Sequence, residues 1–187
     1  MQKEQVVRLL MVEDSMETAE QLVSMLRNGG IPVRPSRAEN LAQITQIITE
    51  GTPDLILCSS ANRSPTLAET VEAVVRSGND IAVIALLAEV NEQTMMGVFQ
   101  TGARAAAIRG RPEHVQRIVK REFEDISMRR AVRKLEIALR EVEKRCDALL
   151  DSSNEPIAFI HEGMHVRANK AYLEMFGYAS FEEIEGN

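Results

Sequence analysis

Short runs of apolar residues alternate along the first part of the chain with segments whose apolar residues recur every three or four positions. The runs predict strands, and the recurring segments predict amphipathic helices. Strands that are apolar on both faces are typical of a parallel sheet that helices cover on both sides. The predicted strands are Val6–Val12, a weaker one at Ile31–Val33, and then Asp54–Cys58, Ile81–Leu87 and Ala105–Ile108.

Residues that start or stop helices bound the helical segments. Three of them end at glycines, which are Gly29–Gly30, Gly51 and Gly78. Pro65 is predicted to lie in the first turn of the third, where a residue without an N–H is tolerated. Alternating strands and helices predict one α/β domain, a five-stranded doubly wound parallel sheet over residues 1–126. The helices are Met16–Asn28, the segment from Leu41 to Gly51, Pro65–Arg76, Asn91–Gln100 and one that begins at Pro112.

The last helix is predicted to be long, because no glycine or proline occurs between Pro112 and Pro156. Its apolar residues from Val115 to Ile126 are expected to face the domain core. Over residues 127–150 the apolar positions follow alternating steps of three and four, the pattern of a coiled-coil seam. We predict a parallel homodimer through this seam; the alternative is a helix that folds back on its own domain. The seam consists of Val132, Leu135, Leu139, Val142, Cys146 and Leu149.

Beyond Asp151 the pattern changes to two short strands within Ile157–Ala168, joined by a turn at Glu162–Gly163. Asn169 is a residue type that caps helices, and a helical segment follows it. We expect a hairpin and a helix in this part of the chain.

Composition adds that the chain is a folded protein, with 44% hydrophobic and 27% charged residues. No apolar run is long enough to span a bilayer and no signal-peptide pattern opens the chain, so we expect a soluble, cytoplasmic protein without membrane insertion. Cys58 and Cys146 are interpreted as buried thiols, because no Cys/His spacing resembles a metal site.

The net charge of −6 argues against a nucleic-acid partner, although basic residues crowd between Arg104 and Arg145. Acidic residues interleave with them throughout this stretch. Such a pattern is typical of a salt-bridged helix surface rather than of a phosphate-binding stripe. We therefore expect no nucleic acid among the partners.

Candidate chemistry lies at the carboxyl ends of the strands, where open α/β sheets gather functional groups. Glu13 and Asp14 follow the first strand, and Ser59, Leu87 and Arg109 stand at the ends of the third, fourth and fifth. The side chains of Ser59, Leu87 and Arg109 are thus predicted to lie close to the carboxylates of Glu13 and Asp14.

Three motifs carry a resemblance to bacterial response-regulator receiver domains: VEDS at Val12–Ser15, PDLILCS at Pro53–Ser59 and the pair Gly102–Ala103. The resemblance implies the CheY-like, flavodoxin-like fold. In that family an acidic pair holds Mg²⁺, an aspartate accepts phosphate, and a hydroxyl and a lysine hold the phosphoryl group. By position, the acidic pair is kept as Glu13 and Asp14. The acceptor is replaced by Ser59, the hydroxyl by Leu87, the lysine by Arg109 and an aromatic switch residue by Ala106.

We interpret these replacements as a lost phosphorylation site, with no catalytic residue and no metal. An aspartyl phosphate is a mixed anhydride formed by a carboxylate, whereas Ser59 offers a neutral alcohol without a neighbouring base in sequence. One carboxylate ligand for a divalent cation is also missing. We expect Arg109 to lie against Glu13 or Asp14 in place of a metal ion. The alternative is a phosphotransfer receiver with an unorthodox acceptor.

The sequence GMHVRANKAYLEMFGY at 163–178 resembles the start of a PAS domain, and REVEKRCDALLDSS at 140–153 resembles the connector before such domains. Residues 151–187 are thus expected to be an incomplete, N-terminal part of a PAS domain. Together with LLMVEDSMETAEQLVSMLRN at 9–28, these segments resemble the FimX family, receiver-PAS-GGDEF-EAL regulators of type IV pili and twitching motility.

The family resemblance implies downstream domains that bind or once processed cyclic di-GMP. It also implies polar or pilus-regulatory proteins as partners of the receiver face, and a polar location. No nucleotide-chemistry motif occurs in the chain itself, so we expect neither enzyme activity nor a cofactor here. Receivers followed by a coiled coil also precede RNA-binding antiterminator domains, but the predicted hairpin at Ile157–Ala168 disfavours that alternative.

Overall fold

The computed structural model describes residues 6–185, which form two compact units, one up to Arg129 and one from Arg130 onward. Residues 1–5 and 186–187, at the outer ends of the predicted ranges, lie outside the described residues. Along residues 6–185 no helix is both long and apolar enough to cross a membrane.

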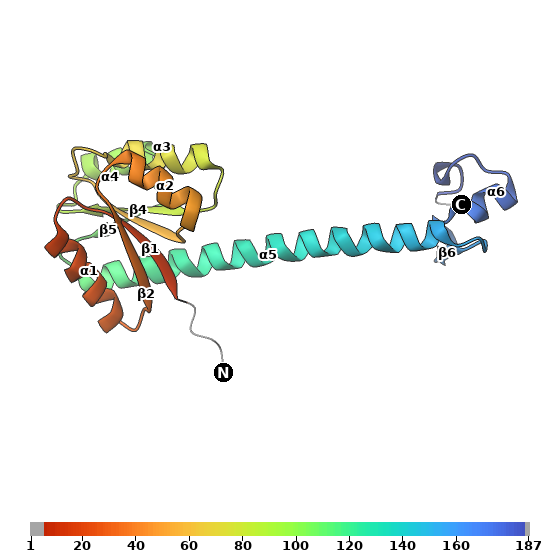
Figure 1. The fold of residues 1–187 in the computed structure, drawn as a ribbon, viewed down its shortest axis with the longest axis horizontal. Helices are drawn as coiled ribbons and strands as arrows, with labels where there is room; N and C mark the ends of the chain where they lie inside the picture. Colours follow the sequence, from red (N-terminus) through yellow and green to blue (C-terminus); the bar gives the residue numbers. More distant parts are fainter. Residues whose placement is uncertain (1–5, 186–187) are drawn as a thin grey trace. The chain divides into compact units, whose positions relative to one another are not determined.

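The first unit contains a five-stranded sheet with the order β2-β1-β3-β4-β5, in which all neighbouring strands are parallel (Figure 1). This confirms the predicted doubly wound α/β fold. The strands are β1 (Val7–Val12), β2 (Val33–Ala38), β3 (Leu55–Ser59), β4 (Ala82–Leu87) and β5 (Ala105–Ile108). The helices are α1 (Met16–Asn28), α2 (Leu41–Gly51), α3 (Leu67–Ser77), α4 (Glu92–Gln100) and α5 (Pro112–Ser152).

Alternate residues of each strand enter two hydrophobic cores, one on each face of the sheet. Leu9 of β1 packs in a core with α1 and α5, whereas Leu10 packs on the other face with α2, α3 and α4. The first turns of α5 contribute Val115, Val119 and Ile126, which are fully buried. The predicted orientation of this part of the long helix is confirmed.

The second strand is where the sequence prediction was wrong. It lies at Val33–Ala38 rather than Ile31–Val33, and it is an edge strand that pairs only with β1. An edge strand can carry polar residues and a proline, here Pro35, because one of its sides forms no ladder. Ile31 is buried in the turn after α1, where its N–H donates to the carbonyl oxygen of Leu26.

The start of α3 also differs from the prediction. It begins at Leu67, and Pro65 precedes the cap residue instead of standing in the first turn. Thr66 and Glu69 form a capping box, with each side chain accepting a hydrogen bond from the backbone N–H of the other. This reciprocal capping fixes the start of α3 two residues later than the proline alone indicates.

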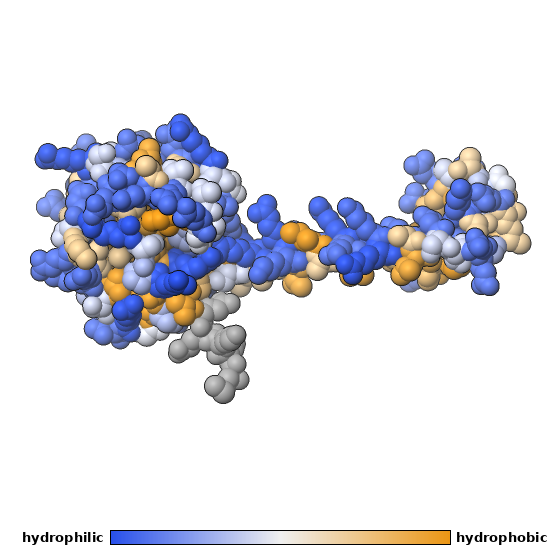
Figure 2. Space-filling model, in the orientation of Figure 1, coloured by the Kyte–Doolittle hydropathy of each residue, from blue (hydrophilic) through white to orange (hydrophobic). Residues whose placement is uncertain are grey.

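The helix α5 is continuous over 41 residues, which confirms the long helix expected from the absence of glycine and proline. Ion pairs hold it to the first unit where it leaves the core. Arg129 of α5 bonds Asp80 at 3.0 Å, and Asp125 bonds Arg104 at 2.8 Å. Beyond this point the residues of the seam are exposed, and apolar side chains show along the helix in Figure 2.

The second unit contains the predicted hairpin, β6 (Ala158–His161) and β7 (Met164–Ala168), paired antiparallel. Glu162 and Gly163 both have positive φ, 50° and 83°, as a two-residue type I′ turn requires. Asn169 caps α6 (Lys170–Phe176), as expected, and a short 3₁₀ turn, η1 (Phe181–Glu183), follows.

Candidate functional site at the carboxyl edge of the sheet

The topology brings the predicted site residues to one edge of the sheet. Glu13 directly follows β1, Ser59 ends β3, Leu87 ends β4 and Arg109 directly follows β5. These strands are parallel and stand in the order β1-β3-β4-β5, so their carboxyl ends lie along one edge of the sheet.

Arg109 is the centre of this edge. Its Nη2 donates to Glu13 Oε2 and also to Ser59 Oγ, the latter at 2.6 Å. Glu13 is only 5% exposed and Ser59 only 2%. A buried carboxylate is costly unless a cation or several donors accompany it, so the guanidinium compensates the charge of Glu13. The predicted contact between Arg109 and the acidic pair is present, and it is made with Glu13.

Asp14 differs from its neighbour, because its side chain points to solvent. Its backbone carbonyl oxygen accepts from Arg37 Nη2 at 3.0 Å, and the carbonyl oxygen of Glu13 accepts from Arg37 Nε at 3.0 Å. Arg37 stands near the carboxyl end of β2 and brings a second guanidinium to the edge. The sequence did not indicate Arg37 because the strand was predicted at Ile31–Val33. A strand at Val33–Ala38 places Arg37 near the carboxyl end, with the other site residues.

Ser59 is held in a setting that disfavours nucleophilic attack. Its Oγ accepts from Arg109 and, more weakly, from the backbone N–H of Ala61 at 3.4 Å. These donors engage the oxygen lone pairs that a nucleophile would use, and along residues 6–185 no histidine bonds the hydroxyl. Within residues 6–185 no group of three His, Cys, Asp or Glu side chains is arranged to hold a metal ion.

The remaining positions carry no polar chemistry. Leu87 is 2% exposed and packs in the core with α2, α3 and α4. Ala106, which the resemblance aligned with an aromatic switch residue, has only a methyl group and packs against the same core. Neither side chain can respond to a group bound at the edge by forming or breaking a hydrogen bond.

The two cysteines behave differently from each other. Cys58 is buried, as expected, and burial raises the pKa of its thiol to about 11, against a weaker lowering by its hydrogen bond with Thr70. Cys146 is exposed on α5, so the interpretation of both as buried thiols was wrong for this residue. A seam position on a lone helix leaves the side chain in water.

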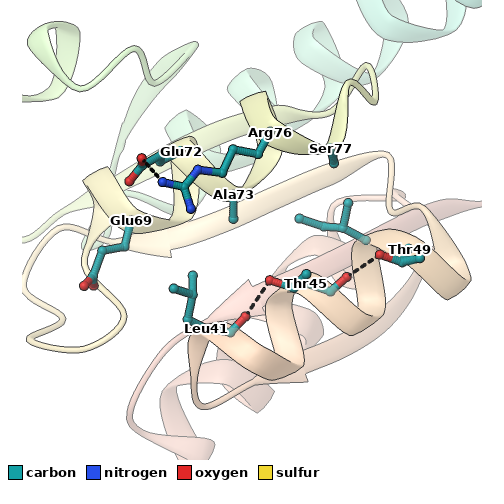
Figure 3. Close-up of a pocket in the computed structure, with 9 residues that line it drawn as sticks. Leu41, Thr45, Thr49, Glu69, Glu72, Ala73, Arg76 and Ser77 are labelled. Atoms are coloured by element: carbon teal, nitrogen blue, oxygen red, sulfur yellow. Dashed lines mark hydrogen bonds and ion pairs between the residues drawn. The ribbon is translucent and has the colours of Figure 1, made fainter.

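A groove of about 240 Å³ lies elsewhere on the domain, between α2 and α3 (Figure 3). Leu41, Ile48 and Ala73 give it an apolar lining, and Arg76 pairs with Glu72 at its rim at 2.5 Å. No residue of the carboxyl edge lines it. The groove and the edge are therefore separate features.

Comparison with solved structures places this geometry in a known fold. The signal receiver domain of NarL from Mycobacterium tuberculosis is 19% identical with a TM-score of 0.56, and the match covers 64% of this chain and 98% of that one. The chain has the fold of a response-regulator receiver domain. No family model matches the chain. No curated protein matches it either.

Two further structural neighbours share the fold. A protein described as a pilus assembly protein, CpaE from Burkholderia thailandensis, is 18% identical with a TM-score of 0.52, covering 62% of this chain and 97% of that chain. A fusion that carries the trimeric coiled coil of yeast Spc42 is 19% identical with a TM-score of 0.58, covering 76% of this chain and 96% of that chain. At these identities the likeness concerns the fold alone.

Proposed function

We propose that this chain is a non-phosphorylatable receiver module that acts in dimerisation and protein docking. We propose further that it belongs to a cyclic di-GMP signalling protein that regulates type IV pili and twitching motility. The observation that carries the first part is the bonding of Arg109 to both Glu13 and Ser59. The second part rests on the resemblance of the sequence to the FimX family, and a pilus assembly protein among the structural neighbours is compatible with it.

Arg109 opposes phosphorylation in two ways. A divalent cation at the edge would need Glu13 as a ligand, and it would have to displace a guanidinium that is part of the chain and already bonded there. Ser59 would also have to attack through an oxygen that accepts hydrogen bonds from a cation. Control of the module would then come from partners and from repacking of α5 rather than from phosphate.

A phosphodonor assay tests this directly. The protein is incubated with acetyl phosphate and Mg²⁺ and its intact mass is measured, with an active receiver treated in parallel. We expect no added phosphate on this chain and one on the active receiver. A persistent gain of one phosphate, lost in Ser59→Ala, would instead establish the rival function of phosphotransfer through an unorthodox acceptor.

Dimerisation is proposed because the seam is apolar, continuous and exposed. Leu135 is 70% exposed, Leu139 60% and Leu149 72%. Full burial of a leucine side chain contributes about 1.5–3 kcal/mol, so pairing of two seams removes a large cost of hydration. A second copy of this chain presents the same stripe, and a fusion with a trimeric coiled coil among the structural neighbours is compatible with association through a helix. A parallel pair places both downstream units at the same end.

A further inference from the structure

One buried side chain, Asn169, connects the end of α5 with the hairpin and α6. It is 1% exposed. Its Oδ1 accepts from the backbone N–H of Tyr172 at 3.0 Å, which caps α6, and from that of Ile157 at 2.9 Å. Its Nδ2 donates to the carbonyl oxygens of Leu150 at 3.0 Å and Glu155 at 2.8 Å.

The two hydrogens of Nδ2 serve these two carbonyl oxygens, and the carbonyl oxygen of Ser153 lies farther away, at 3.4 Å. Leu150 belongs to the last turn of α5, and its carbonyl oxygen also accepts from the backbone N–H of Ser153 at 3.2 Å, so Asn169 supplies a second donor to this end of the helix. The amide of Asn169 therefore caps the carboxyl end of α5 while its oxygen caps the amino end of α6. An ionised aspartate has no donor, and a serine has a single donor hydrogen on a shorter side chain, so neither can make all of these bonds.

A second contact ties the hairpin to α5 one turn earlier. Arg167 of β7 forms an ion pair with Asp147 of α5. Both side chains are partly exposed, so the pair contributes little free energy, but it fixes a second point of attachment. Two points separated along the helix axis restrict rotation of the hairpin about α5 more than one point does.

The face of α5 used for this attachment lies beside the seam. Asp147 and Leu150 each follow a seam residue, Cys146 and Leu149, and are rotated from it by about 100° around the helix. Leu150 is partly covered, whereas Leu149 is 72% exposed. The hairpin thus leaves the seam open.

We propose that Asn169 and Arg167 form a rigid junction, which passes a rotation or repacking of α5 to β6, β7 and α6. Both are positioning residues. The junction lies within one chain and does not depend on dimerisation, so it stands or falls separately from the proposed function. It links the end of α5 to β6, β7 and α6 through two side chains.

Hydrogen exchange on the full chain tests the amide link. Asn169→Asp keeps the oxygen that caps α6 and removes both donors to α5 and its loop. The matched control is Asn40→Asp, because Asn40 caps α2 only through its oxygen, which accepts from Gln43 N at 2.9 Å. With two hydrogen bonds removed, we expect amides of residues 150–157 to exchange on the order of tenfold faster in Asn169→Asp. Asn40→Asp should leave this segment unchanged. Unchanged exchange in Asn169→Asp would overturn the proposal.

A distance measurement tests rigidity. Spin labels at Lys144 of α5 and at the exposed Val166 of β7, in a Cys146→Ser background diluted with unlabelled chain, report the spread of distances across the junction. We expect a narrow distribution in the parent and in Asn40→Asp. A broad one is expected in Asn169→Asp combined with Arg167→Ala. Equal widths in all three would show that the two residues do not set the geometry.

Discussion

At the scale of single residues, Glu13 and Asp14 are adjacent carboxylates in different environments. Glu13 is buried and bonded to Arg109, while Asp14 is turned to solvent. A cation that belongs to the chain cannot diffuse away, so the charge of Glu13 is compensated permanently. The edge holds an ion pair between Glu13 and Arg109, and Arg109 also donates to Ser59.

Replacing Arg109 by methionine should therefore destabilise the domain. The substitution leaves a buried carboxylate without its cation, and because Arg109 is itself 31% exposed we expect a loss of about 1–3 kcal/mol in the free energy of unfolding. Urea unfolding measures it. The matched control is Arg76→Met, whose partner Glu72 is exposed, with an expected loss of about 0–0.5 kcal/mol. Equal losses would mean that Arg109 makes only a surface contact.

At the scale of elements, α5 changes its environment along its length. Its first turns are buried by the sheet, and the ion pairs of Arg129 and Asp125 mark the end of that contact. From Val132 onward the described chain leaves the seam uncovered, although the hairpin covers a neighbouring face near Leu150. The first part of this continuous helix therefore packs in the core of the first unit, and its later part carries an exposed apolar stripe in the second.

A matched pair of substitutions tests whether self-association depends on the seam or on any exposed apolar residue of α5. Leu139 and Ile137 are similarly exposed, 60% and 62%, but only Leu139 lies on the seam. Leu139→Glu should weaken self-association by on the order of 2–4 kcal/mol, since it removes a buried leucine and places a charge in the seam of both copies. Ile137→Glu should leave it unchanged. Sedimentation measures both. If the two variants associate equally well, the interface is not the seam.

At the scale of the whole molecule, the direction of pairing decides where the downstream units lie. In a parallel dimer in register, Cys146 faces the partner's Cys146 across the seam. In an antiparallel pair centred on the seam, the two residues lie roughly 15 Å apart along the axis, beyond the reach of a disulfide. The position of one exposed thiol thus distinguishes the two arrangements.

Oxidation at pH 8 with copper phenanthroline should convert the protein to a covalent dimer on a non-reducing gel. Cys58 should not take part, because it is buried and its pKa of about 11 keeps the thiol protonated. Cys146→Ser is the control and should give no covalent dimer. A wild-type protein that sediments as a dimer but does not cross-link would point to the antiparallel arrangement.

The sequence by itself determined the α/β fold, the long helix and the hairpin turn, because these depend on local periodicity and on residues such as Pro112 and Gly163 that restrict or permit backbone angles. It also predicted the partnership of Arg109 with the acidic pair, since adjacent carboxylates at a strand end need a cation. It did not locate β2, because an edge strand lacks the apolar pattern of a buried one.

The tertiary structure alone decided how residues distant in sequence meet. Arg37 reaches the carbonyl groups of Glu13 and Asp14 only because β2 pairs with β1 in the observed register. The cap role of Asn169 toward α6 could be predicted from its neighbours, but its bond to Leu150 of α5 could not. Hydrogen bonds between segments depend on the relative position of their backbones, which local sequence preferences do not specify.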